Sequence, residues 1–313
     1  MYVEGCQGAR NEVWRSKLTQ CRALGALALA CLLAACEPAS PPSTKPLVVA
    51  TFYPLYEFSR RVAGDRADVV SLVPPGVEPH DWEPSPQNVV QVRKARLFVE
   101  NGAGFEPWVD KLLKDVPGGD KTVIVDTTKG VSLVAVGGTV DPHVWLDPVL
   151  AQAQVDAIRA GLEQADPAHA AAFADNARHF KEQLARLDEA FAAGLRDCAS
   201  RDMFTSHTAF TYLARRYRLT QVPVMGLAPE SEPSPADLAA IAGLARRQHA
   251  RYIFFETLVS SRLAEALARE VGAKTLVLNP IEGLTKEEAA AGKDYVALME
   301  ANLVNLRTGL ACR

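Results

Sequence analysis

The sequence predicts an α/β fold in which two lobes, each built on a parallel sheet, are joined by one long rigid backbone helix. Three observations lead to this prediction. The chain has 313 residues, which is enough for two ordinary domains. Short apolar runs alternate with helical patterns in both halves, as they do in βα units. Between the halves, roughly thirty residues have the periodicity of a single amphipathic helix.

The first α/β lobe is predicted at residues 46–165. Short apolar runs bounded by turn residues indicate its strands, at 47–51, 69–73, 97–99 and 123–125. Helical patterns follow them, at 55–63, from residue 86 onward, and around 106–114. Ser85 and Pro86 are typical of a helix start, because Ser caps the first turn and Pro fits the first helical position.

The linking helix is predicted at residues 166–196. It begins at an Asp-Pro pair and then contains no glycine or proline until Gly194. Apolar residues recur at spacings of three and four and form one stripe: Ala170, Phe173, Ala174, Ala177, Phe180, Leu184, Leu187 and Phe191. At 1.5 Å per residue such a helix is roughly 40 Å long, so it can act as a spine between two lobes.

The second α/β lobe is predicted at residues 197–313, where the alternation restarts. Its strands are expected at 203–206, 222–225, 252–255 and 275–278. Its helices are expected at 209–216, 235–247, 261–271 and 294–310. The two lobes are therefore of similar size.

The N-terminus has the pattern of an export signal. Basic residues precede an uncharged run at 23–35, which is too short to span a membrane but suits a signal-peptide core. The run ends in Leu-Ala-Ala-Cys, which resembles the bacterial lipobox, so residues 1–35 are predicted to be a lipoprotein signal peptide and Cys36 the acylated residue. The alternative is an ordinary signal peptide beside an incidental cysteine. Residues 36–45 are rich in Pro and Ser and are expected to form a tether.

Export places the chain in the periplasm, anchored to a lipid membrane through Cys36. Disulfides persist in that compartment, so Cys198 and Cys312 are either bonded to each other or two free thiols. The formal net charge is −3 and the pI about 6.1, which gives no electrostatic footprint for nucleic acid. We expect a monomer.

Three of the six histidines are candidates for metal binding. His80, His143 and His207 lie after predicted strands or between Asp-Pro turns, and Glu282 lies in the loop after the last strand. In parallel sheets, ligand sites form at the carboxyl ends of strands, so facing lobes would bring the four together. Each residue alone has an ordinary explanation, such as a loop hydrogen bond or a core histidine. Three imidazoles and a carboxylate make a four-coordinate shell that suits Zn²⁺. The other histidines are expected on the surface.

Several motifs resemble those of the substrate-binding lipoproteins of zinc and manganese ABC importers, the cluster A-I receptors. They are VPPGVEPHDWEPSP, NGAGFEPWVDKL, DPHVWLDP, FTSHTAFTYLARRY, YIFFE and LNPIEGLTKEE. The resemblance implies two lobes on one backbone helix, with a metal site in the cleft between them. It also implies a receptor, and not an enzyme, that delivers its ion to an ABC permease and its ATPase. The metal ligands of the family map onto His80, His143 and His207, with a carboxylate from the last loop.

Two details of the ligand set favour zinc. Manganese-binding relatives usually have a carboxylate where this chain has His207, and nitrogen donors suit zinc better than manganese. The family often has aspartate where this chain has Asn279, so the fourth ligand is expected to be Glu282, or else water. Asp147 and Glu256 are candidates for the carboxylates that orient metal-bound histidines, although each could instead serve only its turn or strand end. Trp82 and Trp145 are expected to wall the pocket, or simply to pack in the core.

Two other functions stay open from the sequence. A zinc-dependent hydrolase could use the same donors, although it needs an open position for water, and no HExxH or GxSxG motif is present. A manganese-binding receptor or adhesin of the same fold is the other alternative.

Overall fold

The structure is a computed structural model that describes residues 45–114, 122–229 and 233–313. The predicted signal peptide at 1–35, the lipidation of Cys36 and all of the predicted tether except Lys45 lie outside the described residues. Residues from Lys45 to Arg313 form one compact unit. Within the described parts of this unit, no helix combines the length and the apolar character needed to cross a bilayer.

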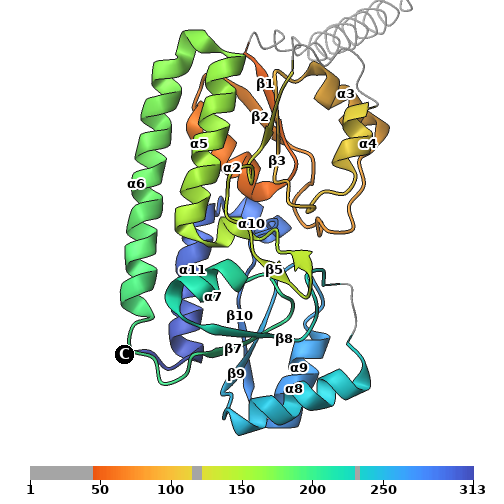
Figure 1. The fold of residues 1–313 in the computed structure, drawn as a ribbon, viewed down its shortest axis with the longest axis vertical. Coiled ribbons are helices and arrows are strands. Elements are labelled where there is room, and N and C mark those ends of the chain that lie inside the picture. Colours follow the sequence, from red (N-terminus) through yellow and green to blue (C-terminus); the bar gives the residue numbers. More distant parts are fainter. Residues whose placement is uncertain (1–44, 115–121, 230–232) are drawn as a thin grey trace, which may run out of the picture. The chain divides into compact units, whose positions relative to one another are not determined.

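The first lobe contains a four-stranded parallel sheet (Figure 1). Its strand order is β2-β1-β3-β4, with β1 at Leu47–Ala50, β2 at Asp68–Ser71, β3 at Leu97–Glu100 and β4 at Val123–Asp126. The helices are α2 (Tyr53–Ala63), α3 (Pro86–Lys94) and α4 (Val109–Lys114). Central strands β1 and β3 are almost wholly buried, which explains their continuous apolar sequence. Ser85 caps α3 as predicted, and it pairs reciprocally with Asn88.

The second lobe repeats this architecture. Its parallel sheet has the order β10-β9-β7-β8, with β7 at Asp202–Thr205, β8 at Thr220–Pro223, β9 at Tyr252–Phe255 and β10 at Lys274–Val277. The helices are α7 (Thr211–Tyr217), α8 (Pro235–Arg247), α9 (Arg262–Val271), α10 (Lys286–Ala290) and α11 (Tyr295–Gly309). The two sheets and the long helix confirm the predicted fold class. The residue boundaries predicted for the two lobes stay predictions.

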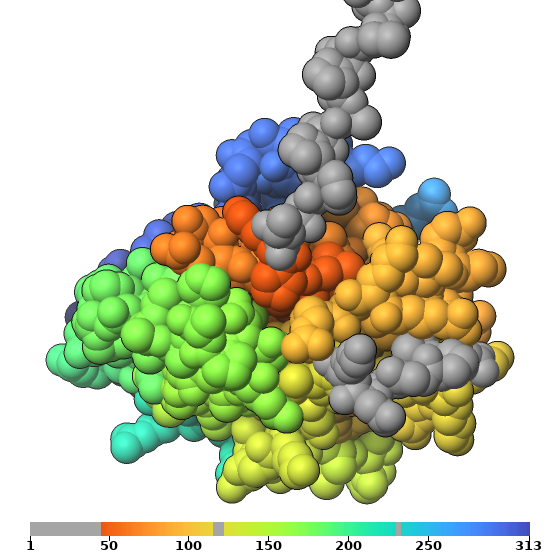
Figure 2. All heavy atoms as spheres, turned by 90° about the horizontal axis from the view of Figure 1, so that it is seen from above, coloured from red at the N-terminus to blue at the C-terminus, as the bar shows by residue number. Residues whose placement is uncertain are grey.

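The long linking helix of the prediction is present, and a second helix packs along it. Helix α6 (Ala170–Gly194) carries the predicted apolar stripe, and Phe173, Phe180 and Phe191 on it are buried. The sequence analysis did not predict α5 (Pro148–Ala165), which packs along α6 (Figure 1). Figure 2 shows the end of this pair, in green, beside the red and orange residues of the first lobe.

Four further short elements were also not predicted. Strands β5 (Ala135–Val136) and β6 (Thr139–Val140) form a small antiparallel hairpin, and α10 is a single helical turn. The 3-10 helix η2 (Val144–Leu146) then leads directly into α5.

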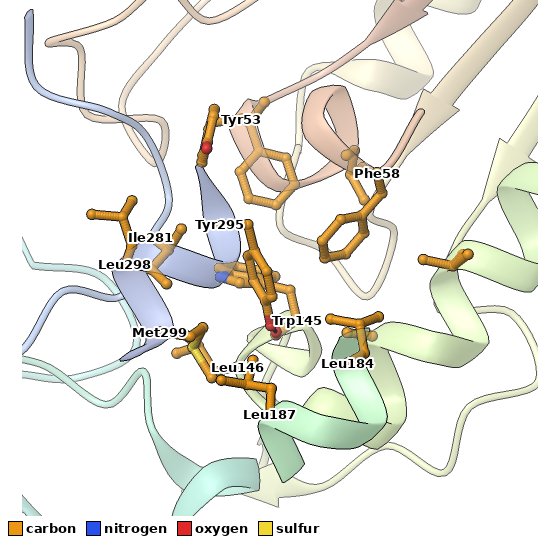
Figure 3. Close-up of a cluster of buried hydrophobic side chains, with 14 of the residues drawn as sticks. Tyr53, Phe58, Trp145, Leu146, Leu184, Leu187, Ile281, Tyr295, Leu298 and Met299 are labelled. Atoms are coloured by element: carbon orange, nitrogen blue, oxygen red, sulfur yellow. Dashed lines mark hydrogen bonds between the residues drawn. The ribbon is translucent and has the colours of Figure 1, made fainter. Parts of the chain in front are cut away.

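One hydrophobic core underlies both lobes. Figure 3 shows Tyr53 and Phe58 of the first lobe in one cluster with Ile281, Tyr295 and others of the second. The rings of Phe58 and Tyr295 meet edge to face with centroids 4.9 Å apart. At the edge of this core, Arg61 of α2 pairs with Asp294, the residue that caps α11. The lobes are therefore fused by apolar packing and do not meet only at a hinge.

A disulfide bond joins Cys198 to Cys312. Cys198 lies just after α6, and Cys312 follows α11, so the bond ties the end of the chain to the end of the backbone helix. Of the two states that the sequence left open, the structure contains the bonded one.

Candidate metal centre

Four side chains converge between the lobes: His80, His143, His207 and Glu282. Their candidate donor atoms all lie within 4.8 Å of one another. Each residue comes from a loop beyond the carboxyl end of a strand, and the first two belong to one lobe and the last two to the other. The structure thus brings together the four residues that the sequence singled out.

The spacing of these atoms fits one small cation. Glu282 Oε1 lies 3.4 Å from Nε2 of His80, 3.2 Å from Nε2 of His143 and 3.3 Å from Nε2 of His207. The Nε2 atoms of His143 and His207 are 3.4 Å apart. Donors at about 2.0–2.1 Å from a tetrahedral zinc ion lie about 3.3 Å from each other. Four edges of the donor cluster therefore already have the length that a bound Zn²⁺ requires.

Burial leaves two donor atoms without ordinary hydrogen bonds. His143 and His207 are fully buried, and the side chain of Glu282 is 2 % exposed. Among the described residues, Glu282 Oε1 and His80 Nε2 have no partner with hydrogen-bond geometry. A buried polar atom without a partner is costly, and a cation bound by these atoms would remove that cost.

The charges of the site shift its pKa values in opposite directions. Burial alone would lower the pKa of His207, but the charges of Glu256 and Glu282 raise it well above the ordinary value. The pKa of His143 is likewise raised, because Asp141 and Glu282 outweigh the effect of burial. Burial would raise the pKa of Glu282, but the neighbouring imidazoles hold it well below the usual range. The electrostatics of the site therefore favour a negatively charged Glu282 with positive charge, from a proton or a cation, at the histidines around it.

Two carboxylates orient the buried imidazoles. Glu256 Oε1 accepts from Nδ1 of His207 at 2.7 Å and from its backbone N–H at 3.1 Å. Asp141 Oδ1 makes the same two contacts with His143, at 2.7 and 3.0 Å. With Nδ1–H donating to a carboxylate, the lone pair of each ring is on Nε2, which faces the other donors.

Of the two roles that the sequence left open for Asp147, the structure shows the one at the turn, with no contact to a metal-site histidine among the described residues. Its Oδ1 accepts from the N–H groups of Val149 and Leu150 and so caps α5, and it lies 3.5 Å from Nε of Arg216. The carboxylate on His143 is instead Asp141, which the sequence analysis missed. Both acids flank the histidine in DPHVWLDP, and the closer one, two residues away, was the available signal. Glu256 does lie where the sequence placed it.

Aromatic rings form the wall under the donors. Trp145 lies 5.2 Å from His143 between ring centroids, and Phe105 lies 4.9 Å from His80. Trp82, for which the sequence left pocket wall and core packing open, packs on Trp108, and both rings line a cleft of about 800 Å³ that also borders His80. The residue sequence reasoning missed here is Phe105, in the segment NGAGFEPWVDKL.

His80 is the donor that reaches the surface. Its side chain is 10 % exposed, whereas the other three donors are almost completely enclosed. The backbone N–H groups of His80 and Asp81 donate to Glu78 Oε2, at 2.9 and 3.3 Å, which stiffens the loop. Of the remaining histidines, His179 and His249 are exposed and His169 is half-buried, and none of the three belongs to the donor cluster.

The chain is similar to known zinc-uptake and zinc-binding proteins. A family profile described as "Zinc-uptake complex component A periplasmic" matches residues 48–309. The high-affinity zinc uptake system protein ZnuA of Bacillus subtilis is 40 % identical over 278 residues, covering 84 % of this chain and 87 % of that protein. The zinc-binding lipoprotein AdcA of Streptococcus pneumoniae is 40 % identical over 294 residues, covering 89 % of this chain but only 58 % of AdcA.

A solved structure is equally similar. The Zn(II)-bound ZnuA-like domain of Streptococcus pneumoniae AdcA superimposes with a TM-score of 0.76 at 42 % identity. The match covers 85 % of this chain and 99 % of that domain.

Proposed function

The chain belongs to the family of the zinc-uptake complex component A, and from this premise we propose that it is a high-affinity zinc receptor for an ABC importer. It binds Zn²⁺ outside the cytoplasmic membrane and passes the ion to a membrane permease that is driven by an ATPase. The names of its relatives, zinc uptake and zinc binding, support this proposal. Zinc is the cargo here and not a catalytic cofactor.

The observation that carries the proposal is the donor cluster itself. Nε2 of His80, His143 and His207 and Oε1 of Glu282 stand at tetrahedral edge lengths for zinc. Three nitrogen donors favour zinc over manganese, which prefers oxygen. Four protein donors also fill a tetrahedral shell, whereas a zinc hydrolase keeps one position open for water. The arrangement is therefore suited to holding an ion.

We propose the location from the sequence. An exported chain acylated at Cys36 would stay on the membrane surface, close to its permease, when more than one acyl chain is attached. We expect it to act there as a monomer. The lobes at 46–165 and 197–313 and the linking helix at 166–196 are the proposed domain units.

Zinc titration of site variants tests the ligand assignment. The metal-free wild-type chain is expected to bind one Zn²⁺ in competition with a chromophoric chelator. His143→Ala should weaken zinc binding at least about 100-fold, because it removes one of the four donors and leaves an incomplete coordination shell around the ion. Glu282→Gln should weaken it less, because an amide is a weak zinc donor but keeps the shape.

The matched control is His179→Ala, which removes an exposed histidine from α6. It should leave zinc affinity unchanged. Wild-type affinity in His143→Ala, or an equal loss in His179→Ala, would contradict the proposed site.

A further inference from the structure

Asn302 lies on α11 and not on a metal-site loop, yet its side chain holds the backbone that leads to Glu282. Its Oδ1 accepts from the N–H of Asn279 at 2.8 Å, and its Nδ2 donates to the carbonyl of Asn279 at 2.6 Å. Asn302 is 1 % exposed. One buried amide therefore satisfies both backbone groups of the residue at which the chain leaves β10.

The next two residues are fixed as well. The side chain of Asn279 turns back, so that its Oδ1 accepts from the N–H of Ile281 at 2.7 Å. The carbonyl of Pro280 accepts from Nε1 of Trp145 at 2.8 Å. The amide of Asn279 is thus used inside the turn and does not join the donor cluster.

Ile281 has an unusual backbone conformation. Its φ is +58°, in the left-handed region, which a β-branched residue seldom adopts unless its surroundings impose it. Its side chain is fully buried and lies in the core cluster with Leu298 and Tyr295 (Figure 3). The hydrogen bonds upstream and this apolar anchor together hold the turn. The residue that follows the turn is Glu282.

We propose that Asn302 and Asn279 form a positioning pair that fixes Glu282 as the fourth zinc donor. This inference rests on the proposed zinc function. It says that the position of the Glu282 carboxylate is set by two residues that do not themselves bind the ion. The carboxylate reaches three imidazole nitrogens at nearly equal distances, 3.2 to 3.4 Å, which requires a backbone with little freedom. Such a pre-set carboxylate loses little entropy when the ion binds.

The test is Asn302→Asp, read by zinc competition and by the visible spectrum of bound Co²⁺. Aspartate keeps the acceptor for the N–H of Asn279 but places an oxygen opposite its carbonyl. We expect zinc affinity to fall about 10–100-fold, as it does when supporting residues of metal sites are changed. The Co²⁺ absorption should lose intensity and resemble that of Glu282→Gln, because tetrahedral Co²⁺ absorbs more strongly than higher-coordinate Co²⁺.

Asn305→Asp is the matched control. Asn305 also lies on α11, and its Nδ2 donates at 2.9 Å to the carbonyl of Val277, at the end of β10. The change removes a similar bond that does not hold the turn, so zinc affinity and the Co²⁺ spectrum should stay at wild-type values. Equal losses in both variants would show general loosening of α11 and overturn the proposal.

Two more variants keep the test decisive. In a Glu282→Gln background, Asn302→Asp should cause no further loss, since it acts through Glu282. If Asn302→Asp does not fold, Asn279→Ala is the substitute, because it removes the side-chain oxygen that accepts from the N–H of Ile281. It should also lower the intensity of the Co²⁺ absorption. A normal spectrum in every folded variant of the pair would refute the positioning role. A wild-type response in Glu282→Gln would instead refute the ligand set of the proposed function.

Discussion

At His143 and His207, the two ring nitrogens have different partners. Nδ1 donates to Asp141 or Glu256, and Nε2 faces Glu282. The fixed ring orientation means that no ring rotation is needed before an ion binds, and that the proton zinc displaces is the one on Nε2. The selectivity and affinity of the site therefore depend on four donors and also on the two carboxylates behind them.

Zinc affinity should depend on pH around neutrality. In the metal-free folded chain, the raised pKa values of His143 and His207 make protonation of the rings stabilising. That contribution is complete below the unfolded value of about 6.5 and is lost as pH rises through the raised folded values. Zinc must displace the same protons, so its affinity should rise with pH by up to about tenfold per unit for each proton. Competition titrations between pH 6 and 8 measure this, and a flat profile would contradict it.

Glu256→Gln should lower zinc affinity about 10–100-fold, because a neutral amide no longer raises the basicity of His207. The fold should persist, since glutamine can still accept from Nδ1–H. Zinc competition and thermal unfolding of the metal-free chain measure the two effects separately. Glu270→Gln, which changes an exposed carboxylate paired with Arg246, is the control and should leave affinity unchanged.

At the scale of elements, helix α5 connects the sheet of the first lobe to the long helix α6. It lies between α6 and strands β3 and β4. Gly161 on α5 allows this close approach: a Cβ there would lie 2.5 Å from Cγ2 of Val125 and 2.9 Å from Cδ1 of Leu97. The helix thus positions η2, immediately before it, and with it the loop that carries His143.

Gly161→Ala should therefore destabilise the fold by about 1–3 kcal/mol, because the added methyl group overpacks the contact between helix and sheet. Gly243→Ala is the matched change in α8, where the nearest atom to an added Cβ is the flexible end of Arg247 at 3.3 Å. It should stabilise the fold by about 0.5–1 kcal/mol through the better helix propensity of alanine. Urea denaturation measures both, and a stabilising effect of Gly161→Ala would show that the contact at Gly161 is not tight.

At the scale of the whole described domain, the two lobes share one core beneath the metal site. Residues of α2, α6, η2 and α11 pack together, and Tyr295 O–H also donates to the carbonyl of Trp145 (Figure 3). Separating the lobes would expose this apolar surface to water, at a cost of about 25 cal/mol per Å². Release of the ion should therefore involve loop movements and small lobe shifts, with the exposed His80 loop the least enclosed part.

Small-angle X-ray scattering of the metal-free and zinc-loaded chains should accordingly give radii of gyration that agree within error. Unfolding of the metal-free chain should be a single transition, with tryptophan fluorescence and far-UV circular dichroism coinciding, because the lobes are not independent units. Two separate transitions, or a clear compaction on zinc binding, would contradict the shared core.

Much of this arrangement could be predicted from local pattern. The apolar runs placed the strands of both sheets to within two residues, and Ser85 marked a helix start that the structure contains. Helix α5 was missed because its buried face includes Gln154, Gly161 and two alanines, so the contrast between its faces is weak. Asp141 was missed because its closer spacing to His143 is only a weak signal: two carboxylates flank the ring, and the fold decides which of them turns toward it.

The sequence by itself determined which residues could bind zinc, because imidazole and carboxylate groups after strand ends are a local property of the chain. Only the tertiary structure decided that they meet, since His80 and Glu282 are far apart in sequence and come together through two sheets packed on one core. It also decided which carboxylates support the rings. Glu256 reaches His207 because β7 and β9 are neighbours in the sheet, and strand order is set by long-range packing that no local pattern encodes.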